Sequence, residues 1–122
     1  MRGEDILSEL KYKRILLKVS GEALGEKTAQ GDGFGLDFRK IGEVCQSIKA
    51  CVDMGVQVGL VIGGGNFWRG VKNGNGKMQR SHADSMGMLA TVINAIAVAD
   101  VLEQHGLDAR VLTAVEINKF LR

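Results

Sequence analysis

The sequence predicts an α/β domain built on a parallel sheet, and three observations support this fold class. Short apolar runs rich in β-branched residues occur three times, at residues 14–19, 56–62 and 110–115. Two segments with apolar residues at helical spacing separate these runs. Because each strand leads into the next through a helix, we expect parallel strands joined by right-handed crossovers.

The composition is that of an ordinary globular domain. The chain has 122 residues, enough for a single core, with 45% hydrophobic and 25% charged residues. A net charge of +2 is too small, and too scattered along the chain, to indicate binding to nucleic acid. Glycine is unusually frequent: 17 of the 122 residues are glycine, about twice the average share of roughly 7%. The chain therefore contains several glycine-built loops.

Cysteine usage and hydropathy bear on the compartment. Cys45 and Cys51 lie on one predicted helix, about 9 Å apart along its axis and on different faces, so they do not pair with each other. Two free thiols fit the reducing cytoplasm. The N-terminus has no apolar signal core, and the longest apolar stretch, residues 86–102, is interrupted by polar side chains. We therefore expect a cytoplasmic protein without a membrane span.

The chain begins with a charged segment, residues 1–11, which we expect to form a loose lead-in to a domain over residues 12–122. The first strand, residues 14–19, ends in Ser20 and Gly21. Residues 21–35 are rich in glycine and are expected to form one long loop.

The first helix follows Asp37, a residue type that favours the N-cap position. Apolar residues then recur at three- and four-residue spacing from Phe38 to Val52, which predicts an amphipathic helix. Gly55 fits the position just past its end. The second strand, residues 56–62, has the length and β-branching of a strand buried on both faces.

The second helix is expected after a polar loop over residues 71–79. It begins between Ser81 and Asp84 and ends at Gly106. This helix is apolar almost all round, which predicts burial against the sheet or against another subunit. With one further strand at residues 110–115, the chain is expected to be about the first half of a larger domain.

Two loops that follow strands carry the candidate site. The first contains Lys18, Ser20 and Gly21, and the second contains the triplet Gly63-Gly64-Gly65 followed by Arg69. Open parallel sheets bind ligands at the carboxyl edge of their strands. Glycine there permits positive φ and lets backbone N–H groups approach an anion. With two cations nearby, these parts suit phosphoryl transfer.

These residues also have simpler interpretations. Lys18 could be a strand-end lysine that reaches solvent, the triplet a tight corner, Arg69 a surface arginine and Asp84 a helix N-cap. The usual nucleotide fingerprints are not met. The segment after Gly21 lacks the Gly-Lys pair of a P-loop, and the triplet lacks the third glycine of a dinucleotide loop.

Four blocks of the sequence resemble the bacterial-type UMP kinases of the amino acid kinase superfamily. The blocks are residues 12–24, residues 33–37, residues 61–66 with Arg69, and residues 84–91. The last block, Asp-Ser-Met-Gly-Met-Leu-Ala-Thr, is specific to UMP kinases within that superfamily. The resemblance covers residues 12–118 and implies a parallel-sheet α/β/α sandwich of the amino acid kinase type, about half of it present here.

The resemblance implies transfer of the γ-phosphoryl group of ATP to UMP, with Mg²⁺ carried by ATP and no identifiable metal ligand in this chain. Lys18 would be the catalytic residue that stabilises the transferring phosphoryl group. The resemblance also implies a homo-oligomer, hexameric in the family, with the second helix in a dimer interface. By matching position, the ATP contacts would come from Lys18, Ser20, Gly21, Gly65 and Arg69, and the UMP contacts from Gly64 and Asp84.

We expect the isolated chain to turn over UMP poorly, because the rest of the nucleotide site has no counterpart in it. One alternative is a non-catalytic nucleotide-binding or assembly module that keeps the phosphate loops. Another is a related carboxylate or carbamate kinase, against which the UMP kinase block at residues 84–91 argues.

Overall fold

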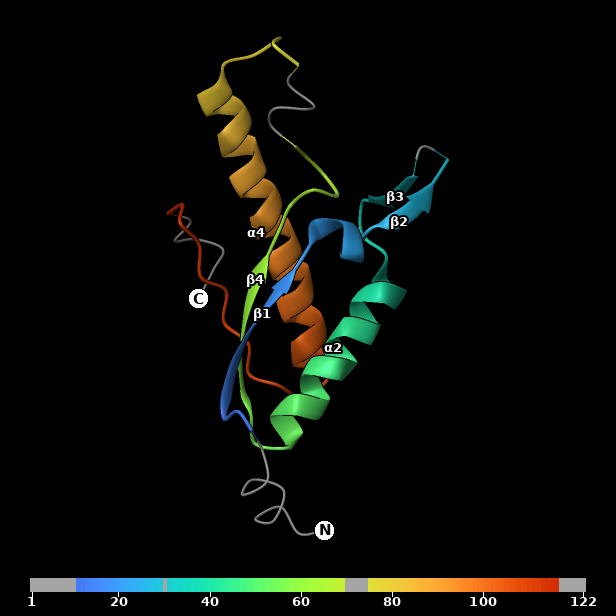
Figure 1. Ribbon diagram of the computed structural model, residues 1–122, viewed down its shortest axis with the longest axis vertical. Helices are drawn as coiled ribbons and strands as arrows, with labels where there is room; N and C mark the ends of the chain where they lie inside the picture. The colour runs from blue at the N-terminus through green and yellow to red at the C-terminus, as the bar shows by residue number, and fades with distance from the viewer. Residues whose placement is uncertain (1–10, 30, 70–74, 117–122) are drawn as a thin grey trace.

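The computed structural model describes residues 11–29, 31–69 and 75–116, and these residues form a small sheet with two long helices (Figure 1). The elements in chain order are β1 (Arg14–Val19), the 3₁₀ turn η1 (Gly21–Leu24), β2 (Glu26–Thr28), β3 (Gly31–Phe34), α2 (Phe38–Asp53), β4 (Gln57–Ile62) and α4 (Arg80–Gln104).

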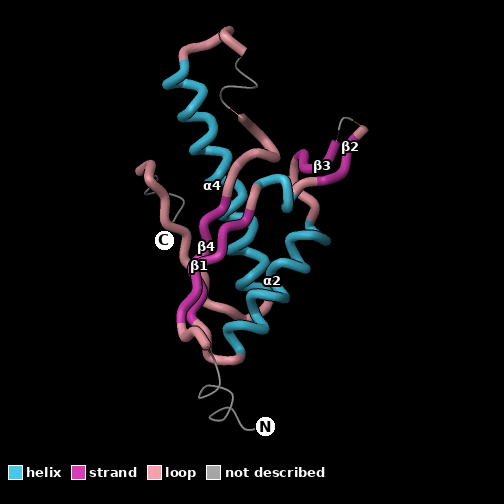
Figure 2. The backbone as a smooth tube through the Cα atoms, viewed as in Figure 1, coloured by secondary structure: helices cyan, strands magenta, loops and turns pink. Residues whose placement is uncertain are grey.

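The central sheet confirms the predicted parallel pairing. β1 and β4 pair in parallel over their whole length, with Lys18 opposite Val61 and Val19 opposite Ile62. The tube view shows the two strands running side by side to the same end of the molecule (Figure 2). Both strands therefore deliver their following loops to one edge of the sheet.

Both helices pack against one face of this sheet. The core joins buried α2 residues, such as Ile41 and Ile48, to buried α4 residues, such as Val98, with alternate β4 side chains against them. The opposite face is uncovered by the described residues, with Leu16 73% and Val61 49% exposed. The described chain is thus two layers of the three expected of an α/β/α sandwich.

Helix α2 begins and ends where the sequence predicts. The Asp37 carboxylate accepts hydrogen bonds from the backbone N–H groups of Arg39, at 3.0 Å, and Lys40, at 3.3 Å. These bonds satisfy two of the amide donors that a helix leaves open at its start. Gly55 lies just past the end at φ 94°, the left-handed conformation that favours glycine.

Helix α4 begins at Arg80, one residue before the predicted interval, and ends near the predicted Gly106. The N-cap interpretation of Asp84 is wrong, because Asp84 lies inside the helix and pairs with Arg80 one turn earlier at 3.1 Å. By length and composition alone, α4 could cross a membrane. Its packing in the core through Val98 and Leu102 favours a core helix instead.

The prediction of one long loop over residues 21–35 is wrong. This segment forms η1 and the antiparallel hairpin of β2 and β3. The hairpin packs tightly on the turn, since a Cβ added at Gly33 would lie 2.6 Å from Cβ of Glu22. Strands of three and four residues with several glycines carry too little periodicity to be recognised in sequence.

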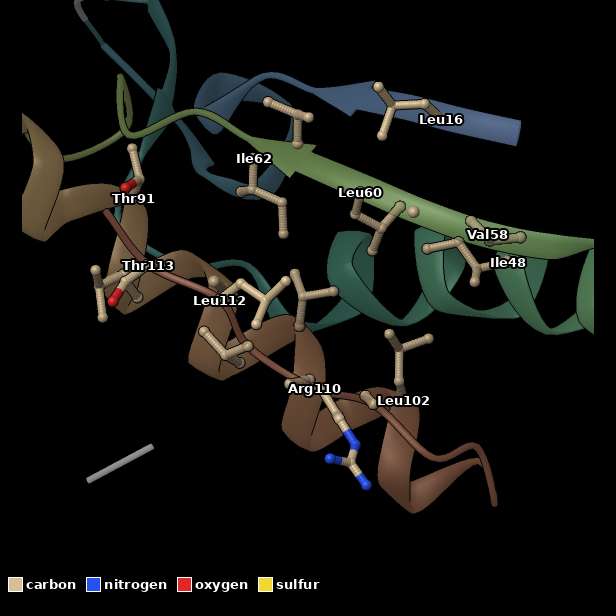
Figure 3. Close-up of a pocket in the computed structure, with 18 of the residues that line it drawn as sticks. Leu16, Ile48, Val58, Leu60, Ile62, Thr91, Leu102, Arg110, Leu112 and Thr113 are labelled. Atoms are coloured by element: carbon tan, nitrogen blue, oxygen red, sulfur yellow. The ribbon is translucent and has the colours of Figure 1, made fainter. Parts of the chain in front are cut away.

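The prediction of a third strand at residues 110–115 is also wrong for this structure. The segment follows the outer edge of β4 but is separated from it by a cavity of about 930 Å³ (Figure 3). Leu60 and Ile62 of β4 line one side of this cavity, and Leu112 of the segment lines another. A strand requires backbone bonds to a neighbour, and the cavity keeps these groups apart.

The remaining expectations concern loops and ends. Residues 75–78 form a turn and a bend, as predicted, whereas residues 71–74 of the expected loop lie outside the described part of the chain. The same is true of most of the expected lead-in, residues 1–10.

Candidate phosphate-binding site

The two predicted loops meet at the carboxyl edge of the sheet. The Gly63 N–H donates to the carbonyl of Val19 at 2.9 Å, which extends the pairing of the strands into the loops. A Cβ added at Gly21 would lie 2.5 Å from the backbone nitrogen of Gly65 and 2.6 Å from Oδ1 of Asn66. Contacts this short exclude any side chain at position 21, so the loops can meet only through glycine.

Helix α4 supports the glycine triplet from the other side. A Cβ added at Gly64 would lie 2.8 Å from Cβ of Ala90 and 3.0 Å from the backbone nitrogen of Thr91. Further along, Nε1 of Trp68 donates to the carbonyl of Ala83 at 2.8 Å. The loop is therefore fixed on the first half of α4.

The expected reason for the glycines is corrected in one respect. None of the three triplet glycines has a positive φ, so left-handed backbone is not what requires them. Close approach to α4 requires glycine at position 64. An added Cβ at Gly63 would lie 3.3 Å from the Gly21 nitrogen, and one at Gly65 would meet only the flexible ends of Glu22 and Arg69.

The triplet leaves backbone donors available to an anion. Within the described residues, the N–H groups of Gly64, Gly65 and Asn66 donate to no backbone or side-chain acceptor. Backbone N–H groups without a partner can donate to an anion. Gly64 and Gly65 are partly exposed and are the candidate donors, whereas Asn66 is 1% exposed.

An ion pair lies beside these donors, and Lys18 lies near the end of the strand that pairs with β4. Lys18 lies next to last in β1, exposed and without an ion-pair or hydrogen-bond partner among the described residues. Arg69 forms an ion pair with Glu22 of η1, and the two side chains are 50% and 37% exposed. The same carboxylate also lies against Gly65, where an added Cβ would collide with it. Glu22 thus occupies space beside the candidate anion site.

The structure brings most of the predicted site residues together. Lys18, Ser20 and Gly21 follow one another at the end of β1, opposite the triplet and Arg69. Asp84 lies apart from them on the first turns of α4, where its side chain is 54% exposed. It is joined to the loop indirectly, because Trp68 bonds to the neighbouring Ala83.

Two residues that the sequence analysis did not select are central to the site. Asn66 and Asn94 are 1% and 0% exposed, and their side-chain amides bond to each other. One signal was available, since Asn94 is a lone amide in an otherwise apolar stretch of helix. Its partner after the triplet could not be identified without the fold.

A metal site is not formed by the described residues. Among residues 11–29, 31–69 and 75–116, no group of three or more His, Cys, Asp or Glu side chains is placed to hold a metal ion.

The chain is similar to two solved structures. It matches a UMP kinase from Bacillus anthracis with a TM-score of 0.80 and 33% identity, over 90% of this chain and 44% of that one. It matches a UMP kinase from Ureaplasma parvum with a TM-score of 0.78 and 33% identity, over 92% of this chain and 46% of that one. The chain thus spans less than half the length of these relatives, and the incomplete α/β fold predicted from sequence is confirmed. The amino acid kinase family model matches residues 13–121, and the chain belongs to this family of kinases.

Proposed function

We propose that this chain carries the phosphate-binding half of a UMP kinase, which transfers the γ-phosphoryl group of ATP to UMP and gives UDP. The observation that carries the proposal is the contact between Gly21 and Gly65, which brings Lys18 and the glycine triplet to one edge of the sheet. Two UMP kinases at 33% identity support the choice of substrates.

The proposed roles follow from the charge that moves during the reaction. Phosphoryl transfer spreads negative charge over the transferring oxygens, and fixed cations and N–H donors stabilise that charge. In our proposal the Lys18 ammonium holds the transferring group, and Mg²⁺ arrives as part of the ATP substrate. The ATP phosphates are contacted by Ser20, Gly21, Gly65 and Arg69, and UMP by Gly64 and Asp84.

The proposal extends to assembly and compartment. Exposed apolar residues of α4 provide a surface for a homo-oligomer, as in the hexamers of the family, and the two free thiols suit the cytoplasm. We further propose that the described residues alone give little turnover. In-line transfer needs both substrates held in position, and the chain spans 44% to 46% of the UMP kinases that it matches.

A second candidate function is favoured by the small share of these UMP kinases that the chain covers. A module that keeps the phosphate loops but not a whole nucleotide site would bind a nucleotide without converting it. The two functions differ in turnover and not in binding.

Calorimetry with Mg·ATP, UMP and UTP, together with an assay of UDP formation, tests both functions on the purified chain. Binding of ATP and UMP with slow UDP formation supports the kinase assignment. Saturable binding with no UDP at any enzyme concentration supports the binding module. If none of these nucleotides binds, the phosphate site itself is refuted.

A further inference from the structure

The two wholly buried polar side chains of the described residues form a pair. Nδ2 of Asn94 donates to Oδ1 of Asn66 at 2.7 Å, and Nδ2 of Asn66 donates to Oδ1 of Asn94 at 3.0 Å. The pair joins the loop after β4 to the middle of α4, 28 residues later. We refer to these two residues as the Asn66–Asn94 pair.

Each amide also holds a backbone carbonyl. Nδ2 of Asn94 donates to the carbonyl of Gly63 at 2.7 Å, and Nδ2 of Asn66 donates to the carbonyl of Gly35 at 2.7 Å. A carbonyl only accepts, so both side chains must present nitrogen to the backbone. Both N–H bonds of each amide are then used, and neither side-chain amide can turn over without losing its three hydrogen bonds.

The bond to Gly63 determines which way the next N–H points. The peptide unit between Gly63 and Gly64 is planar, and in a trans peptide the C=O and N–H point in opposite directions. Because Asn94 draws the Gly63 carbonyl toward α4, the Gly64 N–H is directed away from α4. That N–H is one of the donors left unpaired in the described residues.

We infer that the Asn66–Asn94 pair consists of positioning residues, which orient the backbone N–H groups of the glycine triplet for a phosphoryl group. The inference rests on the proposed function for its ligand and on the structure for its geometry. A role in core packing alone would not require two hydrogen-bonding amide side chains. A buried polar pair is often replaceable by apolar side chains of the same shape without loss of stability, whereas a fully satisfied polar network fixes one arrangement.

Two substitutions test the pair directly. Asn94→Asp places an oxygen opposite the carbonyl of Gly63, and Asn66→Asp places an oxygen opposite the carbonyl of Gly35. Both bury one carboxylate at nearly the same depth, so both should destabilise the fold to a similar extent. We expect each variant to weaken UMP binding at least tenfold, because UMP is the proposed ligand of Gly64. Unchanged UMP affinity in a folded variant of either kind would overturn the inference.

Val101→Ala is the control for general destabilisation. Val101 is 7% exposed and lies two turns further along α4, away from the loop. We expect this variant to unfold at lower urea concentration while keeping the affinity of the unmodified chain. A matching loss of affinity in Val101→Ala would show that loop binding simply follows stability, and the inference would fail.

A measurement on the unmodified chain covers the case in which a variant does not fold. In NMR spectra, the side-chain amide protons of Asn94 should exchange slowly with solvent, both with and without UMP. Added UMP should shift the Gly64 backbone N–H resonance. Fast exchange of the Asn94 protons, or their loss of protection when the nucleotide binds, would contradict a fixed pair. If UMP does not bind at all, the proposed function fails, while the exchange rates still test the geometry.

Discussion

Gly21 and Gly65 follow two different strands and lie in backbone contact, so that a Cβ on Gly21 would be 2.5 Å from the Gly65 nitrogen. Neither residue has a positive φ. Gly21 is glycine because two loops cross at one point, above a parallel pair of strands whose register ends at Val19 and Ile62. The candidate phosphate site is therefore a consequence of sheet pairing, and it should be sensitive to any added volume at the crossing.

Gly21→Ala tests this sensitivity. The added methyl group meets backbone atoms, which cannot move aside as a flexible side chain would, so we expect a loss of about 1–3 kcal/mol in the free energy of unfolding. Nucleotide binding should be lost as well. The matched control is Gly42→Ala in α2, where an added Cβ meets nothing within 4 Å. In a helix interior that change should stabilise the fold by about 1 kcal/mol. Urea denaturation measures both, and a stable, binding-competent Gly21→Ala variant would contradict the crossing.

Lys18→Met tests the proposed catalytic cation. Lys18 is exposed and has no partner in the described residues, so its loss should change the free energy of unfolding by less than ~0.5 kcal/mol. A charge-assisted bond to phosphate contributes roughly 1.5–3 kcal/mol, so Mg·ATP affinity should fall about tenfold to a hundredfold. Lys49→Met removes the same charge from α2, where Lys49 pairs with Asp53 at 2.8 Å. Calorimetry should show normal affinity for this control, and equal losses in both variants would indicate a general charge effect.

Glu22→Gln tests repulsion at the candidate anion site. The Glu22 carboxylate pairs with Arg69 and lies beside Gly65, where it repels an incoming phosphate. Removing its charge should tighten Mg·ATP binding several-fold, and the gain should be smaller at high salt, which screens the repulsion. Titrations at two salt concentrations measure this effect. Weaker binding would mean instead that Glu22 positions Arg69 for the ligand.

The sequence was sufficient to predict the helices and strands that have strong periodicity or clear signals at their ends. Asp37 and Gly55 mark the ends of α2 by local chemistry, and the buried run of β4 is recognisable from its β-branched residues. The hairpin over Glu26–Phe34 was missed because its strands are short and rich in glycine, so that they carry too little periodicity to be recognised. The Asn66–Asn94 pair was missed for a similar reason: its two halves belong to different elements, and only the fold brings them together.

The predicted third strand is the opposite kind of error, because the sequence pattern indicates a strand that the structure does not form. Residues 110–115 have a strand-like sequence, but a strand forms only when its backbone finds a neighbour. Here the cavity beside β4 separates the two segments, and the face of the sheet that carries Leu16 is uncovered. A local pattern identifies a segment that can form a strand, whereas the surrounding chain decides whether it does.

The thiols provide a test of the core between the helices. Burial raises the pKa of Cys45, whose Sγ lies 3.8 Å from the carbonyl of Val98, so its reactive thiolate is suppressed at neutral pH. Cys51 is half-buried, and iodoacetamide should modify it first, with Cys45 reacting only on unfolding. Because the pKa of Cys45 is higher in the folded chain, the unfolded chain releases its proton first as pH rises. The free energy of unfolding should therefore fall above the ordinary value of 9.0. Mass spectrometry of the modified peptides checks the order, and early labelling of Cys45 would contradict the packing of α2 on α4.

The exposed side of α4 provides the last test, which concerns assembly. Five large apolar side chains there are between 40% and 48% exposed, a concentration that marks interaction surfaces on folded proteins. They are Met86, Met88, Leu89, Ile93 and Ile96.

If this surface joins two copies, Ile93→Glu should dissociate the oligomer, because an interface buries the added charge without a partner. Light scattering at micromolar concentration measures the mass. The control is Asp100→Asn, an exposed α4 residue whose carboxylate accepts a hydrogen bond from Gln104 within the same helix, and it should leave the mass unchanged. A monomeric unmodified chain would refute the interface, whereas an oligomer that persists in Ile93→Glu would place it on the uncovered face of the sheet.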